Sequence, residues 1–205
     1  MIAIIDYDAG NIKSVEKALE YLRADYILTK DPSALMAADH VILPGVGAFG
    51  DAMDKIRSSG LVPVINRIIQ AGTPFLGVCL GLQLLFEESE EAPGIPGLGI
   101  LKGRILKIPR KEGLKIPQIG WNSLQFPNRG RLFDGIDENS FVYFVHSYYL
   151  KADDPSIVTA TCEYGVTVHA SVESGNIFAC QFHPEKSSET GLWILRNFIA
   201  VQKEG

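Results

Sequence analysis

The sequence predicts an α/β fold with three layers, in which helices cover both faces of a mixed sheet. In the first half of the chain, short apolar runs alternate with segments whose apolar residues recur at helical spacing. This alternation is typical of a parallel sheet with helices on both sides. From residue 99 to residue 180, strand-like runs separated by glycine, proline and aspartate predict antiparallel strands toward the C-terminus.

The first half contains four expected strands and five expected helices. Apolar residues at Ile12, Val15 and Leu19 have helical spacing, and Asp31 followed by Pro32 is typical of a helix start. We expect strands at 2–5, 25–30, 41–44 and 74–78. We expect helices at 12–23, from residue 32, and at 48–58, 61–71 and 79–88.

The second half is expected to be mostly β-structure. Strand-like runs occupy 100–108, 141–150, 157–162, 166–172 and 177–182. The last two runs predict a hairpin with a short turn, and an amphipathic helix over 191–202 follows them. At 205 residues, without an internal repeat or a linker, the chain is expected to form one domain over 1–205.

Composition and charge argue against several classes of protein. The net charge is −5 and there is no run of lysine and arginine, whereas nucleic-acid binding needs a basic face. No apolar stretch approaches the ~18–20 residues that span a bilayer, and the N-terminus lacks the basic start of a signal peptide. Three cysteines without close pairs favour free thiols in a reducing compartment, so we expect a cytoplasmic protein.

A cysteine lies where a buried strand is expected to turn into a helix. Cys79 is flanked by Gly77 and Gly81, and small neighbours are what a sharp strand-to-helix turn requires. The position would also place the sulfur at a helix N-terminus, which favours the nucleophilic thiolate. The alternative is a cysteine that only packs, and we prefer that interpretation for Cys162 and Cys180.

A base for this nucleophile follows the last expected strand. His183 and Glu185 flank Pro184, and alternate residues of an extended segment point to the same side. A carboxylate on one imidazole nitrogen leaves the other to exchange a proton with sulfur. Taken alone, this pattern also fits a strand-end histidine beside a solvated glutamate. The other histidines lack an acid two positions away: His40, His146 and His169.

A glycine-rich segment at 44–50 admits two interpretations. It matches the dinucleotide-binding pattern G-x-G-x-x-G, but it follows the third expected strand, and the next strand ends in Cys79 instead of a ribose-binding acid. We prefer the second interpretation, in which backbone N–H groups of the segment stabilise an oxyanion beside Cys79. A metal site at Cys79, His183 and Glu185 is not expected, because no C-x-x-C or H-x-x-x-H pair accompanies them.

Three motifs together resemble a known family. PGVGAFG at 44–50, GVCLGLQLLFE at 77–87 and FHPEKS at 182–187 resemble the class I glutamine amidotransferases, which use a Cys-His-Glu triad. The resemblance implies a flavodoxin-like or Rossmann-like fold. IDYDAGNIKSV at 5–15, IGWNSL at 119–124 and YFVHSYY at 143–149 look like the glutaminases that serve a cyclase subunit in histidine biosynthesis. Asp8 departs from this pattern, because glycine or another small residue is expected there.

The resemblance implies a role for each matching residue. The nucleophile, the base and the acid that orients the base match Cys79, His183 and Glu185. The oxyanion would be bound by backbone N–H groups of Gly45, Val46, Gly47 and Leu80. The substrate glutamine would contact Gln83, Glu91, Ser147 and Tyr148.

The resemblance also implies a partner. In this family the glutaminase docks on a (β/α)₈ cyclase subunit as a heterodimer, and ammonia passes through the barrel. Positions at that contact match Asn11, Trp121, Tyr143 and Lys186, although packed aromatic or solvated polar residues would look the same. No cofactor and no metal is expected. The alternatives are the glutaminase of another synthase, such as a pyridoxal phosphate or anthranilate synthase, and a non-catalytic binding module.

Overall fold

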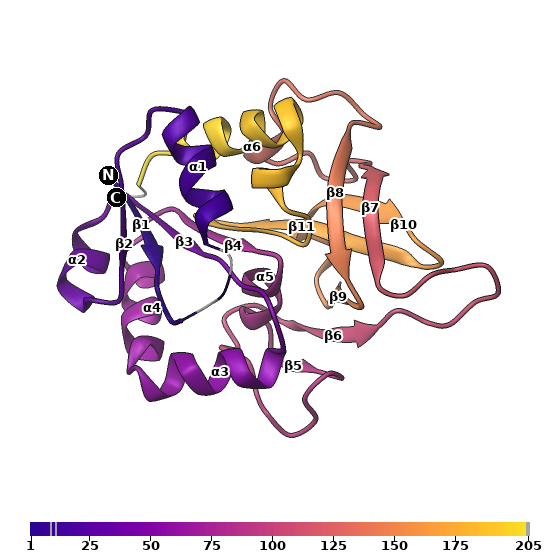
Figure 1. Ribbon diagram of the computed structural model, residues 1–205, viewed down its shortest axis with the longest axis horizontal. Coiled ribbons are helices and arrows are strands. Elements are labelled where there is room, and N and C mark those ends of the chain that lie inside the picture. The colour runs from indigo at the N-terminus through magenta and orange to yellow at the C-terminus, as the bar shows by residue number, and fades with distance from the viewer. Residues whose placement is uncertain (9, 11, 204–205) are drawn as a thin grey trace.

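A seven-stranded sheet lies at the centre of the computed structural model, which describes residues 1–8, 10 and 12–203 (Figure 1). Its strands are β1 (Ile2–Ile5), β2 (Tyr26–Thr29), β3 (His40–Leu43), β4 (Phe75–Val78), β10 (Val158–Glu163), β11 (Thr167–Ser174) and β12 (Ile177–Cys180). They are ordered β10-β11-β12-β4-β3-β1-β2. The strands from β12 to β2 run parallel, whereas β11 is antiparallel to both its neighbours. The predicted mixed sheet with antiparallel C-terminal strands is confirmed.

Helices cover both faces of this sheet, as predicted. They are α1 (Lys13–Tyr21), α2 (Pro32–Ala37), α3 (Phe49–Ser58), α4 (Leu61–Gln70), α5 (Leu80–Leu84) and α6 (Ser188–Ala200). Short 3₁₀ turns are η1 (Arg131–Phe133), η2 (Pro155–Ile157) and η3 (Pro184–Lys186). Residues of α2 to α5 belong to one buried cluster and residues of α1 and α6 to another, with the sheet between them (Figure 1). Three layers result.

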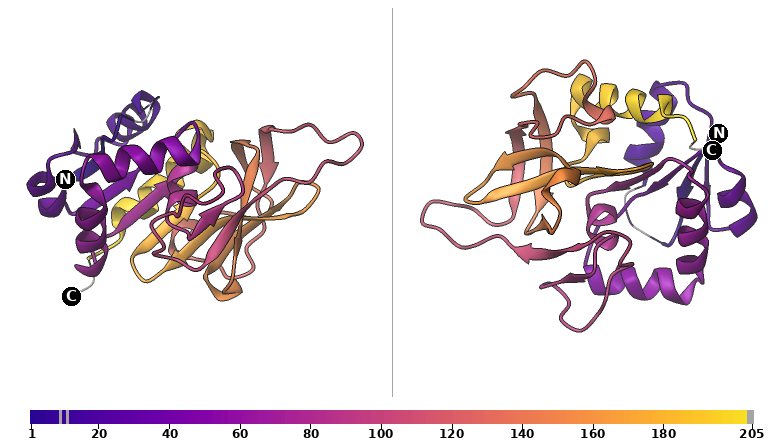
Figure 2. Two further views of the ribbon diagram at one scale, coloured as in Figure 1. Left: turned by 90° about the horizontal axis from the view of Figure 1, so that it is seen from below. Right: turned by 180° about the vertical axis from the view of Figure 1, so that it is seen from behind.

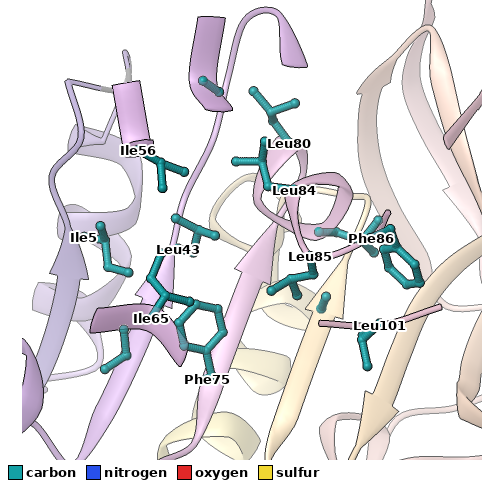
Figure 3. Close-up of a cluster of buried hydrophobic side chains, with 14 of the residues drawn as sticks. Ile5, Leu43, Ile56, Ile65, Phe75, Leu80, Leu84, Leu85, Phe86 and Leu101 are labelled. Atoms are coloured by element: carbon teal, nitrogen blue, oxygen red, sulfur yellow. The ribbon is translucent and has the colours of Figure 1, made fainter. Parts of the chain in front are cut away.

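The strands contribute side chains to both clusters by alternation. Ala3 and Ile5 of β1 lie in one cluster, and Ile2 and Ile4 lie in the other. In Figure 3 the strand residues Leu43 and Phe75 face the helices, opposite the side chains Ile56, Ile65, Leu80 and Leu84. Burial on both faces explains why these strands appear in the sequence as short continuous apolar runs.

Two smaller sheets differ from the sequence prediction. The run 141–150, expected as one strand, divides at Ser147 into β8 (Phe141–His146) and β9 (Tyr148–Ala152). β8 pairs with β7 (Gln118–Ser123), while β9 joins β6 (Gly103–Lys107) and β5 (Glu88–Ser89). The prediction of a single strand over 141–150 is therefore wrong, because the chain changes sheets at Ser147. In Figures 1 and 2 the β7–β8 sheet lies at the opposite end of the molecule from both termini.

The helix predicted over 79–88 is also shorter in the structure. α5 ends at Leu84 because N–H groups of a later loop bind the carbonyl groups that the next helical turn would have used. Leu98 N–H donates to Leu84 O at 2.8 Å, and Ile100 N–H donates to Leu85 O at 2.9 Å. Contacts between residues far apart in the sequence thus end a segment made of good helix formers. Other expected details are confirmed, including the Asp31 cap, whose side chain accepts from Ala34 N–H at 2.9 Å, and the β11–β12 hairpin.

Two more features bear on the predictions. Asp8 has φ 60, a left-handed conformation that glycine adopts most easily and that aspartate tolerates. This conformation explains why a small residue was expected at that position. Among the residues described, no helix combines the length and apolar character needed to cross a bilayer. The single domain over 1–205 stays a prediction.

Candidate active site

Cys79 occupies the sharp turn between β4 and α5, and its backbone is held in an uncommon conformation with φ 55 and ψ −109. The flanking glycines are required by crowding. A Cβ on Gly77 would lie 2.7 Å from the carbonyl oxygen of Gly81, and a Cβ on Gly81 would overlap the carbonyl oxygen of Leu43. The predicted strand-to-helix elbow is present, and its glycines serve close packing of the backbone.

His183 and Glu185 lie side by side, though on a different backbone from the one expected. His183 Nδ1 is 2.8 Å from Glu185 Oε1, and the side chains are only 5% and 4% exposed. The segment is not extended: η3 begins at Pro184 and turns Glu185 back toward His183. Donation from Nδ1–H to the carboxylate leaves Nε2 for Cys79.

The charge state of His183 follows from its neighbours. Burial by itself lowers the pKa of His183, but hydrogen bonds to Cys79 and Glu185, together with their negative charges, raise it to about 10. The arrangement therefore favours the imidazolium form of His183, a positive charge that can stabilise a developing thiolate nucleophile. This combination can attack a carbonyl carbon and then protonate a leaving group.

A pocket of about 320 Å³ opens beside these groups. Most of the residues predicted from the sequence line it: Val46, Gly47, Cys79, Leu80, Gln83, Glu91, Ser147, Tyr148, His183 and Lys186. Glu185 lies behind His183 and Gly45 is buried at the base of the loop, so neither lines the pocket. Oε2 of Glu91 accepts from the N–H of Phe49 at 2.9 Å, which anchors this carboxylate at the start of α3.

The expected oxyanion donors are only partly available. The N–H of Leu80 donates to the carbonyl of Gly45 at 3.3 Å. Gly45 is tightly packed, because a Cβ there would lie 2.8 Å from each of Tyr7 Oη, Leu80 Cβ and Gly81 N. Gly47 has φ 97 and open space around its Cβ position. In this arrangement of the loop, the N–H of Leu80 is therefore bound to Gly45 O and cannot bind an oxyanion.

Several site residues gave no signal in the sequence. Gln181 is fully buried, accepts from Gln83 Nε2 at 2.9 Å, and places its own Nε2 3.8 Å from Cys79 Sγ. Ser187 ties two segments together, since its hydroxyl donates to His183 O at 2.6 Å and accepts from Tyr143 N–H at 2.9 Å. Only a polar residue at an apolar strand position could have indicated Gln181.

His146 lines the pocket as a neutral hydrogen-bonding group. Burial lowers its pKa to about 4. Nδ1 lies 2.8 Å from the carbonyl oxygen of Tyr148, which can only accept, so Nδ1 carries the proton. Its Nε2 lies 2.9 Å from the side chain of Gln118. His146 therefore orients the Tyr148 backbone at the pocket wall.

The residues expected at a partner contact fall into three groups. Trp121 and Tyr143 are cross-strand neighbours whose rings meet edge to face at 5.9 Å. They share one face of the β7–β8 sheet with the exposed side chains of Ile119 and Phe141. Lys186 lies instead on η3 at the pocket. Asn11 lies outside the described residues. Within residues 1–8, 10 and 12–203, no group of three or more His, Cys, Asp or Glu could hold a metal ion.

Comparisons with known proteins identify the family. The chain matches the family model for "Glutamine amidotransferase class-I" over residues 3–201. It is 51% identical over 205 residues to the imidazole glycerol phosphate synthase subunit HisH of Thermosynechococcus vestitus, covering 99% of this chain and 98% of that protein. The subunit of the same name from Moorella thermoacetica is 50% identical over 197 residues, covering 96% and 93%.

A solved structure supports the fold. The crystal structure of a glutamine amidotransferase has a TM-score of 0.75 to this chain at 19% identity, and the match covers 97% of this chain and 99% of that one. The family expected from the motifs is therefore confirmed: the chain belongs to the class-I glutamine amidotransferases and, within them, to the family of the HisH subunits of imidazole glycerol phosphate synthase.

Proposed function

We propose that the chain hydrolyses the side-chain amide of glutamine and passes the ammonia to a cyclase subunit, which makes imidazole glycerol phosphate and AICAR from PRFAR. The observation that carries this proposal is the buried pair of His183 and Glu185, 2.8 Å apart, beside Cys79 at the wall of an open pocket. No cofactor is required, because a thiolate, an imidazole and backbone donors suffice for acyl transfer.

The first half of the reaction forms a thioester. The Cys79 thiolate attacks the carboxamide carbon, and the carbonyl oxygen becomes an oxyanion held by backbone N–H groups. When the tetrahedral intermediate collapses, the C–N bond breaks and His183 gives its proton to the departing nitrogen, so that ammonia leaves. Glu185 stabilises the imidazolium and fixes its orientation through Nδ1.

The second half releases glutamate. His183, now neutral, takes a proton from water, and the hydroxide attacks the thioester carbon. The C–S bond breaks and the thiolate–imidazolium pair is restored. Gln83 and the backbone of Ser147 and Tyr148 lie at the pocket wall to hold the amino-acid end of the substrate, and the anchored carboxylate of Glu91 suits its ammonium group.

Control of the reaction is proposed to reside in the Gly45–Gly47 loop. Because Leu80 N–H donates to Gly45 O, the loop must shift before that donor can bind an oxyanion. We therefore expect the isolated chain to be nearly inactive, and we expect the cyclase with its ribonucleotide to favour the shifted loop. The exposed face carrying Ile119, Trp121 and Phe141 supports docking there, since contiguous apolar side chains mark interaction sites.

The direct test measures glutamine hydrolysis by the chain alone, with a candidate cyclase, and with the cyclase plus its ribonucleotide. Activity is expected to rise strongly in the last mixture, and full activity of the chain alone would contradict loop control. Cys79→Ala should abolish glutamine-dependent turnover while the complex still uses added ammonia. Residual hydrolysis by this variant at the wild-type rate would end the assignment of the nucleophile.

The two alternative functions predict different outcomes for the same purified protein. A glutaminase of a pyridoxal phosphate or anthranilate synthase would co-purify with that synthase, and a binding module would show no hydrolysis with any partner. The identity of 51% with a HisH subunit over nearly the full length favours the cyclase. The heterodimer, the contact residues and the cytoplasmic location stay predictions.

A further inference from the structure

Gln181 is a buried polar residue beside the proposed nucleophile, and the proposed reaction gives it no role. It follows β12 directly, and β12 pairs in parallel with β4. The N–H of Cys79 donates to the carbonyl of Cys180 at 2.8 Å, so Gln181 and Cys79 lie at the ends of adjacent strands. The Gln181 side chain is 0% exposed. A buried amide is costly unless it is hydrogen-bonded, so its partners are informative.

The Gln181 amide bridges two residues that line the pocket. Its Nε2 lies 3.8 Å from Cys79 Sγ, and its Oε1 accepts from Gln83 Nε2 at 2.9 Å. Nε2 of Gln83 also donates to the carbonyl oxygen of Tyr148 at 3.2 Å. A continuous hydrogen-bonded chain therefore runs from the backbone of Tyr148 through two amides to the sulfur.

The direction of this chain is fixed, because a carbonyl oxygen can only accept. Tyr148 O requires the NH₂ group of Gln83 to face it, and that NH₂ group requires the oxygen of Gln181. The nitrogen of Gln181 is then the atom that faces Sγ. The O and N atoms of an amide are told apart by their hydrogen-bond partners, and these partners make the contact an N–H group of Gln181 that donates to sulfur.

A donor at Sγ favours the reactive form of cysteine. As a thiol, Cys79 donates to the carbonyl oxygen of Val145 at 3.8 Å, and that oxygen offers nothing to a thiolate. An N–H from Gln181 stabilises the thiolate, because hydrogen bonds to charged groups are the stronger ones. At its other end, Gln181 engages one N–H of Gln83 and so leaves the oxygen of Gln83 for the substrate.

We propose that Gln181 is a positioning residue that couples the nucleophile to the glutamine-binding side chain. Its nitrogen holds Sγ of Cys79, and its oxygen holds the amide of Gln83. This inference rests on the proposed function for the roles of Cys79 and Gln83. It implies that loss of the Gln181 amide lowers the reactivity of Cys79 even when no substrate is present.

The test is the rate at which iodoacetamide alkylates Cys79 in the isolated chain, followed by mass spectrometry. Gln181→Met keeps the side-chain length but removes both the donor and the acceptor. Alkylation is expected to be roughly tenfold slower, which corresponds to one lost hydrogen bond to a charged group. The other cysteines do not interfere, because burial raises the pKa of the Cys162 thiol to about 12 and that of Cys180 well above its usual range.

Ser171→Ala is the matched control. It removes a buried side-chain hydrogen bond, 2.8 Å to the carbonyl of Ala179, on the strand beside Gln181 and without contact to Sγ. This control should be alkylated at the wild-type rate. A folded Gln181→Met protein that is also alkylated at the wild-type rate would overturn the inference. The alkylation assay contains neither glutamine nor cyclase, so its result does not depend on the proposed function. A failure of the proposed function would be detected separately, as the absence of glutamine hydrolysis by the wild-type complex.

A second measurement leaves Gln181 in place. In ¹⁵N-labelled protein the side-chain NH₂ signal of Gln181 should shift when Cys79 is replaced by alanine. The NH₂ signal of Asn197, which donates to Leu132 O and Asp134 O, should not. An unchanged Gln181 signal would contradict the contact with sulfur.

The assembled enzyme separates positioning from a merely structural role. Gln181→Met should lower kcat and raise KM for glutamine, because it affects both Cys79 and Gln83, while ammonia-dependent turnover stays at the wild-type level. A structural role would instead lower glutamine-dependent and ammonia-dependent turnover together, and that result would overturn the proposal.

Discussion

Two glycine-flanked segments follow adjacent strands, and their glycines serve opposite purposes. At the Cys79 elbow after β4, Gly77 and Gly81 are packed so closely against backbone atoms that no Cβ fits. In the loop after β3, Gly45 is also confined, with three atoms 2.8 Å from its Cβ position, whereas Gly47 has φ 97 and nothing near its Cβ position. Crowding fixes the nucleophile in one conformation, while the loop is fixed at its base and unrestricted at its tip. The chain thus combines an elbow that must stay rigid with a loop that is able to change.

Hydrogen bonding supports the same contrast. The elbow is held by the Cys79 N–H, which donates to Cys180 O at 2.8 Å, and the loop touches it through the longer bond from Leu80 N–H to Gly45 O at 3.3 Å. Shifting the loop would break the weaker of these two bonds and leave the elbow intact. Substitutions in the two segments should therefore affect different properties: stability at the elbow and activity at the loop.

Gly81→Ala is expected to have the largest effect on stability. The new Cβ would overlap the carbonyl oxygen of Leu43, and a backbone contact cannot be relieved by turning a side chain. We expect unfolding in urea to show a loss of about 3 kcal/mol, at the upper end of the cost of overpacking. Gly60→Ala is the control: Gly60 has φ 70, which costs alanine about 1 kcal/mol, but it has open space around its Cβ position. Equal losses for both variants would show that crowding at the elbow is unimportant.

The pH dependence of stability should report the positive charge of His183 beside the elbow. The folded-state pKa of His183 is raised above its ordinary value of 6.5 by Cys79 and Glu185, although burial opposes this. A raised pKa stabilises the fold fully below the unfolded pKa and loses that contribution as pH rises toward the folded pKa. Between pH 6.5 and pH 8, stability should therefore fall by up to about 1.4 kcal/mol per pH unit.

His183→Gln supplies the control for this prediction, because it removes the titrating group and should flatten that part of the profile. The measurement is the free energy of unfolding by urea at several pH values for both proteins. Parallel profiles for wild type and variant would show that His183 does not carry the raised pKa in solution.

The sequence could predict the elbow because part of its crowding is local: a Cβ on Gly77 would lie 2.7 Å from the carbonyl oxygen of Gly81, four residues on. Gly77, Cys79 and Gly81 specify it within five residues of chain. It predicted that His183 and Glu185 would be neighbours, but for the wrong reason, since the turn at η3 and not an extended strand brings them together. That turn depends on α6, where a Cβ on Gly191 would overlap the carbonyl oxygen of Pro184. Contacts of this kind are not visible in a local pattern.

Other misses share the same cause. The run 141–150 consists mostly of good strand formers on both sides of Ser147, so only pairing with two different sheets reveals the break there. The end of α5 is set by a loop that contains Leu98 and Ile100. Gln181 has no sequence signal because its role depends on the neighbouring strand, which carries Cys79. Residues that act through long-range partners are the ones that sequence reasoning did not find.

Gly47→Ala tests the loop and should affect activity more than stability. Alanine meets no atom there, but a positive φ costs an L-residue about 1 kcal/mol, which penalises the arrangement that keeps Leu80 N–H engaged. Glutamine hydrolysis by the isolated chain is therefore expected to rise about fivefold, the equivalent of that energy. A fall in activity would show that the working arrangement of the loop also needs a positive φ at this position.

Tyr7→Phe should have the smallest effect and tests whether the base of the loop is anchored. The Tyr7 hydroxyl donates to the carbonyl of Pro44 at 2.9 Å in the buried interior, and burial, with the charge of Cys79 as a second cause, raises its pKa so that it stays a donor. Losing this bond should cost about 1 kcal/mol in unfolding and lower kcat for glutamine in the complex without changing KM. Tyr164→Phe removes the same group from an exposed bond to Lys115 O at 2.8 Å. Tyr164 directly follows β10, the edge strand that β11, β12 and β4 separate from β3 and its loop, so this variant should leave kcat unchanged. If both variants behave alike, the confinement of Gly45 by packing alone holds the loop, and the hydroxyl adds nothing to it.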